Sequence, residues 1–182
     1  MLILLSGVSG VGKNTVIARL LKMRKNLSFV LSGTTRTRRN SEKDANYIYM
    51  SEQEFARREK NGEFFETQQV HGNMYGVLKA SLLKVSEDKE KDYIKDIDVY
   101  GNKKVRQFLK GKAKVLSIFL DAPDEILRER LKGRGEEEER IKVRLSRAEE
   151  ERSFKSDYDA VIENIDLEKT ITKIVELIEK NK

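Results

Sequence analysis

The feature that most constrains the fold is a short apolar run that leads directly into a glycine-rich loop. The run is Leu2–Leu5 (LILL), and the loop is Gly7–Thr15 (GVSGVGKNT). A helix-type pattern follows at once, because Val16, Ile17 and Leu20 recur at three- and four-residue spacing. An uninterrupted apolar run suits a strand that is covered on both faces. The sequence therefore predicts a parallel α/β sheet in which this loop joins a buried strand to a helix.

The glycine loop has the composition of a phosphate-binding loop. Gly7, Gly12 and Lys13 fit the pattern G-x-x-x-x-G-K-[ST], in which backbone N–H groups and a helix N-terminus surround phosphate oxygens. Asn14 stands where the pattern has a hydroxyl, and the hydroxyl comes one residue later, at Thr15. The alternative interpretation is a tight turn that merely requires glycine. The residues expected to line the phosphate site are Gly7, Ser9, Gly10, Val11, Gly12, Lys13, Asn14 and Thr15.

Composition limits the partners and the compartment without selecting a function. The 182 residues suffice for one compact domain, and 37 Lys and Arg against 31 Asp and Glu give a net charge of +6. This charge suits anionic partners, but an ordinary solvated surface explains it equally well. The absence of cysteine excludes disulfides and thiolate metal sites and fits a reducing, cytoplasmic compartment. No apolar run approaches the ~18 residues of a membrane span, and the amino-terminal run is too short for a secretory signal.

Strand and helix patterns alternate through most of the chain. Further strands are expected at residues 28–32, 92–98, 114–120 and 159–164. Helices are expected at residues 99–109, 124–131 and 167–180. This alternation predicts a mostly parallel sheet with helices on both faces.

The stretch 33–86 interrupts this alternation. Strand patterns at 46–50 and 63–70 flank a short helix, which Ser51 and Glu54 open as a capping box. We therefore expect a small insertion with a mixed sheet, and we expect it to hold a second substrate pocket.

Two segments concentrate charge. Arg36, Arg38 and Arg39 stand within four residues, and guanidinium groups bind phosphate bidentately. A second anion site is one interpretation of this loop, and a basic surface loop is the other. Farther along, the segment 133–152 is expected to begin as a loop and to continue as a helix. Its acidic run, Glu136–Glu139, suits a helix N-terminus, where the backbone dipole favours negative charge.

The order and spacing of eight short motifs resemble those of guanylate kinases. The motifs are GVSGVGKNT, SGTTRTRR, NYIYMSEQEF, GEFFE, HGNMYG, DIDVYG, ERLKGRG and VIEN, which together run from Gly7 to Asn164. The resemblance implies an α/β P-loop three-layer fold with a mostly parallel sheet, a small mixed-sheet GMP-binding insertion and an arginine-bearing lid. It places the core at 1–32, 87–132 and 154–182, the insertion at 33–86 and the lid at 133–153. It also implies the reaction ATP + GMP ⇌ ADP + GDP with Mg²⁺.

The resemblance further implies roles for individual residues. The catalytic cations are Lys13, Arg39, Arg134 and Arg144. The GMP phosphate is expected at Arg36, Arg39, Tyr47 and Tyr75. The guanine and its nucleoside are expected at Ser32, Glu66, Val77 and Asp98. Magnesium is expected near Asn14 and Asp96, partly through water.

These roles agree with the chemistry of phosphoryl transfer. The protein has little covalent work to do, because aligning two anions and offsetting their repulsion supplies most of the catalysis. Glu66 suits guanine, which offers two adjacent donors at N1 and N2 that one carboxylate can accept. His71, the single histidine, is interpreted as a turn residue.

Several positions depart from the family pattern. Val77 stands where Ser or Thr is usual, which removes a hydroxyl near the base. Arg38 replaces a usual proline, and Tyr100 stands where Gln is common. Lys95 is unexpected on a strand that should be buried on both faces. None of these changes removes a cation that is expected at a phosphate.

Other functions remain open at the level of the sequence. A non-catalytic guanylate-kinase-like module that binds phosphorylated peptides is one alternative, although it has little use for an intact phosphate loop. A kinase with another acceptor, such as a different monophosphate or a phosphorylated sugar, is a second. We expect GMP, dGMP and ATP as partners, no nucleic acid and no membrane, and a monomer or a homodimer.

Overall fold

The main sheet contains five parallel strands and forms the centre of the molecule. The computed structural model describes residues 1–38, 47–70 and 72–182. The strands lie in the order β2-β7-β1-β8-β9, and all four pairings between them are parallel. Their bounds are β1 Leu2–Gly7, β2 Leu27–Phe29, β7 Asp92–Asp96, β8 Val115–Asp121 and β9 Ala160–Glu163.

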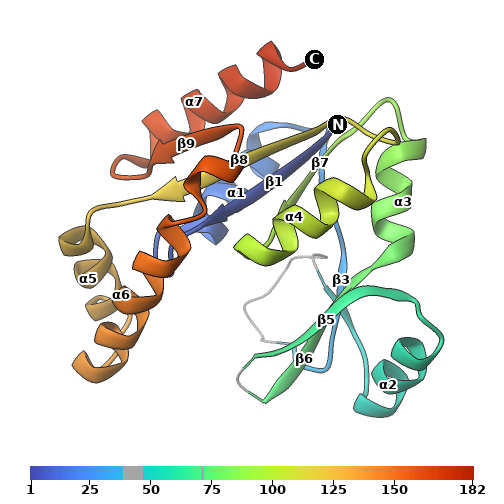
Figure 1. The fold of residues 1–182 in the computed structure, drawn as a ribbon, viewed down its shortest axis with the longest axis horizontal. Coiled ribbons are helices and arrows are strands. Elements are labelled where there is room, and N and C mark those ends of the chain that lie inside the picture. The colour runs from blue at the N-terminus through green and yellow to red at the C-terminus, as the bar shows by residue number, and fades with distance from the viewer. Residues whose placement is uncertain (39–46, 71) are drawn as a thin grey trace.

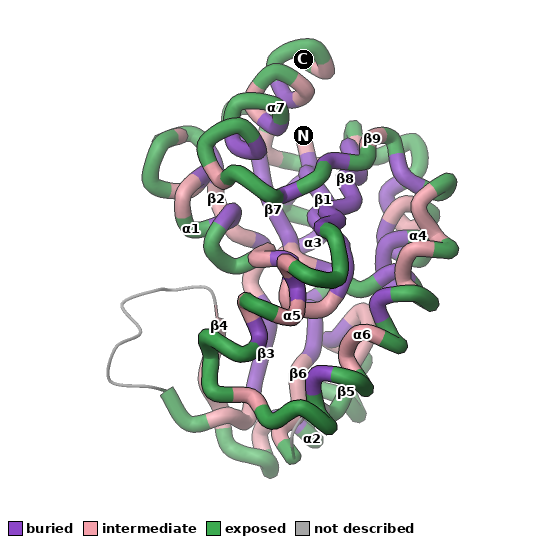
Figure 2. The backbone as a smooth tube through the Cα atoms, turned by 90° about the vertical axis from the view of Figure 1, so that its left-hand side faces the viewer, coloured by how far each residue is buried: buried purple, intermediate pink, exposed green. Residues whose placement is uncertain are grey.

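Side chains of β1 enter both layers of the core, as the apolar run predicts. Ile3 and Leu5 pack with α1 (Lys13–Met23) and α7 (Leu167–Lys180) on one face. Leu2 and Leu4 pack with α3 (Lys79–Glu87) and α4 (Val99–Phe108) on the other. The expected three-layer α/β architecture is confirmed (Figure 1). Figure 2 shows the buried stretches concentrated in β1, β7 and β8.

A second, smaller sheet mixes parallel and antiparallel pairs. Its order is β4-β3-β6-β5, with β3 parallel to β4 and antiparallel to β6. Helix α2 (Glu52–Lys60) covers it, and Phe55, Phe64 and Leu78 form its own small core. The strands are β3 Ser32–Thr34, β4 Tyr47–Tyr49, β5 Phe64–Val70 and β6 Asn73–Leu78.

Two packed helices, α5 (Asp124–Lys132) and α6 (Glu138–Arg152), form the third region. Figure 1 shows them at the lower left, apart from the small sheet at the lower right. Arg152, at the end of α6, donates to Asp121 and Ala122 at the end of β8. This contact anchors the carboxyl end of α6 to the main sheet. A 3-10 turn, η1 (Lys155–Asp157), then leads into β9.

The expectation of one strand at 28–32 is wrong. The chain leaves the main sheet after β2, passes Val30 and Leu31, and joins the small sheet as β3. Strand β6 and helix α3 were not expected, because neither carries a clean periodic pattern. Ser51 Oγ accepts from Glu54 N as a helix cap, and the Glu54 carboxylate accepts from Arg57 and Arg58.

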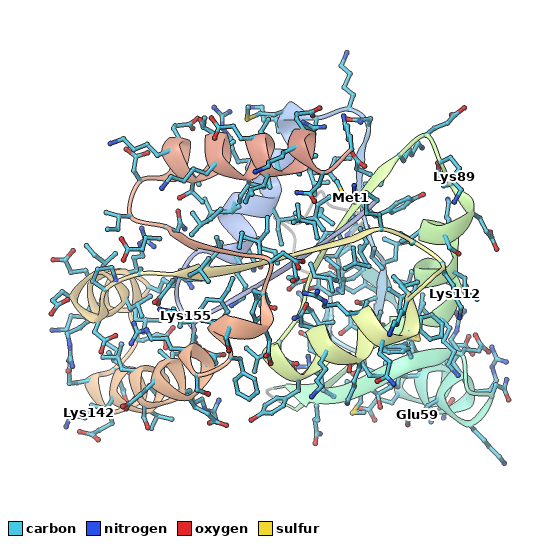
Figure 3. The ribbon with its side chains drawn as sticks, turned by 45° about the horizontal axis from the view of Figure 1, so that its top comes forward. Met1, Glu59, Lys89, Lys112, Lys142 and Lys155 are labelled. Carbon is cyan, nitrogen blue, oxygen red and sulfur yellow. The ribbon has the colours of Figure 1, made fainter. Side chains whose placement is uncertain are left out.

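Charged side chains cover the periphery of the molecule. Figure 3 shows labelled examples such as Lys89, Lys112 and Lys142, and all three are exposed. Much of the charge is therefore an ordinary solvated surface. Among the described residues, no helix is both long and apolar enough to cross a membrane.

Candidate active site

The glycine loop has a backbone that only glycine adopts readily at several points. Gly7 has φ of +145°, and a Cβ there would lie 2.2 Å from the Leu120 carbonyl oxygen. Gly12 has φ of +100° and caps α1. The loop is also held from outside, because the Val11 carbonyl accepts from Arg130 at 2.9 Å and from Asn164 at 2.7 Å. Close packing and side-chain contacts thus fix the loop against the core.

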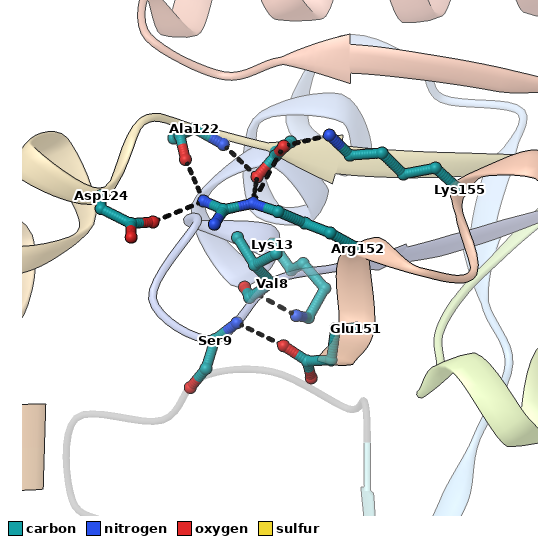
Figure 4. Close-up of polar contacts among 9 residues, drawn as sticks. Val8, Ser9, Lys13, Ala122, Asp124, Glu151, Arg152 and Lys155 are labelled. Carbon is teal, nitrogen blue, oxygen red and sulfur yellow. Dashed lines mark hydrogen bonds and ion pairs between the residues drawn. The ribbon is translucent and has the colours of Figure 1, made fainter. Parts of the chain in front are cut away.

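Lys13 lies at the start of α1 and turns back over the loop. Its Nζ donates to the carbonyls of Gly7 at 2.5 Å and Val8 at 3.4 Å, the latter drawn in Figure 4. Burial lowers the pKa of Lys13, while the negative charges of Glu151, Asp96 and Asp98 act in the opposite direction. An anion that entered the loop would restore favourable surroundings for this ammonium. Asn14 and Thr15 follow on the exposed side of the same turn.

Side chains of α6 contact the glycine loop directly. Arg144 donates to Ser9 Oγ at 3.1 Å and pairs with Glu136 at 2.8 Å. Glu151 accepts from the Ser9 backbone N–H at 2.9 Å (Figure 4). Burial raises the pKa of Glu151, and Lys13 opposes that shift. A carboxylate thus occupies a loop N–H of the kind that binds phosphate in such loops.

The two arginines expected in the lid lie in different surroundings. Arg144 lies against the glycine loop, whereas Arg134 is exposed in the turn between α5 and α6. Arg39 lies outside the described residues. Of the expected catalytic cations, the structure therefore shows Lys13 and Arg144 at the glycine loop.

A second pocket lies where the small sheet meets the end of β7. Four of its lining residues had no expected role in binding: Gln68, Gly76, Lys95 and Ile97. The remaining lining residues are those expected at an acceptor nucleotide or its metal: Ser32, Tyr47, Glu66, Tyr75, Val77, Asp96 and Asp98. Seven expected residues from separate parts of the chain thus meet in one pocket.

An aromatic and cationic group flanks this pocket. The Tyr47 and Tyr75 rings are 5.9 Å apart and pack edge to face. The Arg36 guanidinium lies over the rings of Tyr47 and Tyr49 at 5.7 and 5.6 Å. Phenol hydroxyls and a guanidinium at one edge of a pocket suit a phosphate.

Glu66 reaches into the pocket because its neighbour on α4 lacks a side chain. A Cβ on Gly101 would lie 2.7 Å from Glu66 Oε1. Burial raises the pKa of Glu66, and so does the negative charge of Asp98. Lys104, whose Nζ is 3.7 Å from Glu66 Oε2, opposes the shift.

Asp96 is the last residue of β7, Asp98 lies two residues later, and the two carboxylates have different partners. Asp98 caps α4 by accepting from Gly101 N at 2.7 Å. Asp96 accepts from Lys95 at 3.2 Å and lies near enough to Lys13 to affect its pKa. Within the described ranges, no three carboxylate or imidazole groups cluster as a metal site. Mg²⁺ that binds through phosphates and water needs only one or two protein ligands, which Asn14 and Asp96 can supply.

Two residues of the site escaped the sequence reasoning. Lys95 had no account there, and the structure places it inside the second pocket. Glu151 is one glutamate of an acidic and basic run, and nothing local distinguishes it from Glu149 or Glu150. Only the tertiary contact with Ser9 reveals it.

The fold and these two sites define an α/β protein of the P-loop class, with a second ligand pocket beside the phosphate loop. The family model described as "Guanylate kinase" matches residues 1–181. Guanylate kinases of Bacteroides thetaiotaomicron and Thermotoga maritima are 39% and 36% identical to the chain. Those alignments cover 98% and 97% of the chain and 88% and 85% of the relatives.

A solved structure agrees with these sequence matches. The crystal structure of guanylate kinase from Anaplasma phagocytophilum superposes with a TM-score of 0.74 at 32% identity. The match covers 99% of the chain and 85% of the other protein. The chain therefore belongs to the guanylate kinase family.

Proposed function

We propose that this chain transfers a phosphoryl group from ATP to GMP, and more weakly to dGMP, with Mg²⁺, as a step of purine nucleotide metabolism. One observation carries the proposal. Ser32 and Glu66 line a single pocket with Asp96 and Asp98, and these two aspartates also act electrostatically on Lys13 of the phosphate loop. A base-binding pocket and a phosphate loop therefore meet at the end of one strand.

On the donor side, the loop N–H groups and Lys13 would hold the ATP phosphates. Lys13 would leave the carbonyls of Gly7 and Val8 for phosphate oxygens, because an anion satisfies a buried ammonium better than neutral carbonyls do. Arg144, which already contacts Ser9, would stabilise charge on the group in transfer.

On the acceptor side, recognition would be divided between base and phosphate. Glu66 would accept from N1–H and the 2-amino group of guanine. Arg36, Tyr47 and Tyr75 would hold the monophosphate, and Arg39 would join them. Arg134 would approach the transferred group when the α5–α6 region closes, which would also exclude water as a competing acceptor.

Asn14 and Asp96 would hold the metal, whose charge would offset that of the donor phosphates. Asn14 offers an amide oxygen at the first turn of α1, and Asp96 offers a carboxylate at the end of β7. Both are oxygen donors, as Mg²⁺ requires.

A coupled assay of ADP release with GMP, AMP, CMP and UMP tests the proposal. We expect GMP to be the preferred acceptor by a wide margin, because a pocket that pairs with guanine leaves its polar groups unsatisfied with other bases. Equal rates with AMP and GMP would refute the assignment of Glu66, and a preference for another monophosphate would change the acceptor.

Calorimetric titration with ATP separates the enzyme from a non-catalytic interaction module, since a module that uses only the acceptor side should not bind ATP. We further propose that the protein acts in the cytoplasm, as a monomer or homodimer, without nucleic-acid or membrane partners. The absence of cysteine supports a reducing compartment.

A further inference from the structure

Strand β7 carries a buried lysine in the middle of the molecule. Lys95 is 4% exposed and lies between Ile94, which is fully buried, and Asp96. Strand alternation gives it the same face as Tyr93, which packs in an apolar layer with Val30. A buried ammonium is costly unless it is paired and hydrogen-bonded, so its partners should reveal what it does there.

Two protein acceptors and one ring surround the ammonium. Its Nζ donates to Ser32 Oγ at 2.8 Å and to Asp96 Oδ1 at 3.2 Å, and it lies 4.7 Å from the Phe29 ring centroid. An ammonium has three N–H donors. Across the described part of the chain these two are its only acceptors, so one N–H is left for a ligand.

Lys95 lines the same pocket as Glu66, and the wall beside it is apolar. Val77 lies directly opposite Ser32 in the β3–β6 pairing and is 8% exposed. Val77 offers no hydrogen bond to a base. Because Ser32 accepts from Lys95, its own hydroxyl proton is free to be donated into the pocket. Lys95 and Ser32 therefore present donors beside this apolar residue, whereas Glu66 presents an acceptor.

That arrangement matches the edge of guanine. The base has an acceptor, O6, beside its N1–H and 2-amino donors, whereas adenine carries an amino donor at C6. We propose that Lys95 determines specificity by donating a hydrogen bond to the 6-oxo group of the acceptor purine, while Glu66 accepts from N1–H and the 2-amino group. The proposal rests on the proposed function, because it specifies how the same pocket selects its substrate.

Recognition is then divided between two charged side chains. Lys95 distinguishes 6-oxopurines from 6-aminopurines, because an ammonium facing an amino group leaves two donors opposed. Glu66 distinguishes a 2-amino group from its absence. Burial raises the pKa of Glu66, and the positive charge of Lys95 opposes that rise, which favours the ionised form that accepts from guanine.

Steady-state kinetics of Lys95→Met with GMP, IMP and AMP test this division. The assay is run at mildly alkaline pH, because high pH favours the ionised form of Glu66. IMP keeps the 6-oxo group and lacks the 2-amino group. We expect kcat/KM to fall about 10- to 100-fold for both GMP and IMP, the size of one lost charge-assisted hydrogen bond. The rate with AMP should not fall, so the GMP-to-AMP ratio collapses while the GMP-to-IMP ratio stays constant.

Lys104→Met is the matched control. Lys104 also pairs with Glu66, but its side chain is 63% exposed and lies outside the pocket lining. At the alkaline pH of this assay, its removal should leave the GMP-to-AMP ratio unchanged, since it does not face the base. Lys95→Gln and Lys95→Met/Val77→Thr extend the test. The amide of the first keeps a neutral donor, and the hydroxyl of the second lies opposite Ser32 and restores one, so both should recover several-fold of the selectivity.

The outcomes separate this inference from the proposed function. If the wild-type chain uses GMP no better than AMP, the proposed function itself fails. If the wild type prefers GMP and Lys95→Met lowers GMP and AMP equally, Lys95 is a general counter-charge and the inference is wrong. A GMP-to-AMP ratio that stays within twofold of wild type in both Lys95→Met and Lys95→Gln would also overturn it.

Discussion

The phosphate loop and the second pocket are built from different materials. The loop presents mainly backbone N–H groups, shaped by Gly7 and Gly12 and fixed through the Val11 carbonyl. The second pocket presents side chains that come from both sheets and from the segment that follows β7. Backbone recognition tolerates substitution of most side chains, whereas side-chain recognition changes with each residue. Under the proposed function, this difference means that phosphate binding and base selection can vary independently in this fold.

The two regions also differ in the hydrogen-bond partners of their charged side chains. In the loop, Lys13 donates to main-chain carbonyls, and Glu151 occupies the Ser9 N–H. In the pocket, Lys95 and Ser32 bond to each other and leave Glu66 facing the cavity. Under the proposed function, ATP would have to break internal contacts in the loop, whereas the pocket would receive the base with Glu66 already facing the cavity.

The largest effect is expected on the donor side. Lys13→Ala removes the one full positive charge that α1 supplies to the loop, so kcat should fall at least ~100-fold with every acceptor. Single-turnover and steady-state measurements of ADP release check this. Lys22→Ala, on the exposed end of the same helix, is the control and should keep wild-type rates. Turnover of Lys13→Ala within a few-fold of wild type would show that the donor site is misplaced.

The next effect should be confined to the base. Glu66→Gln replaces one acceptor oxygen by a donor, so kcat/KM for GMP should fall on the order of 100-fold while KM for ATP stays unchanged. Selectivity over AMP should fall with it. Glu63→Gln, three residues earlier and outside the pocket lining, is the control. A parallel rise in KM for ATP would contradict the independence of the two regions.

The pH profile should report the surroundings of Glu66. Burial and Asp98 raise its pKa above 4.5, while Lys104 and Lys95 oppose the shift. Because only the ionised carboxylate accepts from guanine, kcat/KM for GMP should be lost as the pH falls through this raised pKa. Asp98→Asn keeps a good helix cap and removes a negative charge, so the acidic limb should move to lower pH. Lys104→Met removes a positive charge and should move it to higher pH.

If both variants gave the same pH profile as the wild type, the acidic limb would belong to a group other than Glu66. The comparison uses kcat/KM, which reports groups of the free enzyme and free substrate. The phosphate of GMP titrates equally for all three proteins and therefore cannot produce a difference between them.

The smallest effect is expected at Glu151, whose carboxylate accepts from a backbone N–H of the glycine loop. Glu151→Gln weakens the competitor for Ser9 N–H, because a neutral amide accepts less strongly than a carboxylate. We expect KM for ATP to fall a few-fold, about 2- to 5-fold, with little change for GMP. Glu149→Gln, exposed on the same helix, is the control. An increase in KM for ATP would mean that Glu151 supports the loop instead of competing for it.

Much of the fold was predictable because its elements carry strong local patterns. The apolar run of β1, the helix after Gly12 and the helix at 167–180 follow from periodicity and turn residues. The break between β2 and β3 was not predictable, because the apolar run across Val30 and Leu31 is continuous while the chain changes sheet there. Strand β6 was missed because its pairing partners, β3 and β5, define it more than its own sequence does.

The site shows the same division. Lys13, Glu66 and Tyr75 could be named as candidates from the sequence because they stand in ordered motifs. Lys95 and Glu151 were not, since their roles depend on contacts 63 and 142 residues away in sequence. The sequence around each residue does not indicate contacts with residues so far away along the chain.

The alternation of side chains at the end of β7 has a consequence for how this protein can change. Under the proposed function, neighbouring positions there would act on different ligands: Asp96, besides lining the second pocket, influences the pKa of Lys13 in the glycine loop, whereas Lys95 donates to Ser32 Oγ. Replacing residue 95 would alter substrate preference and spare the donor half. Inserting or deleting a single residue upstream would exchange the two roles at once, because every side chain would turn to the other side. This segment can therefore tolerate substitutions during evolution, but it cannot tolerate the insertion or deletion of a residue.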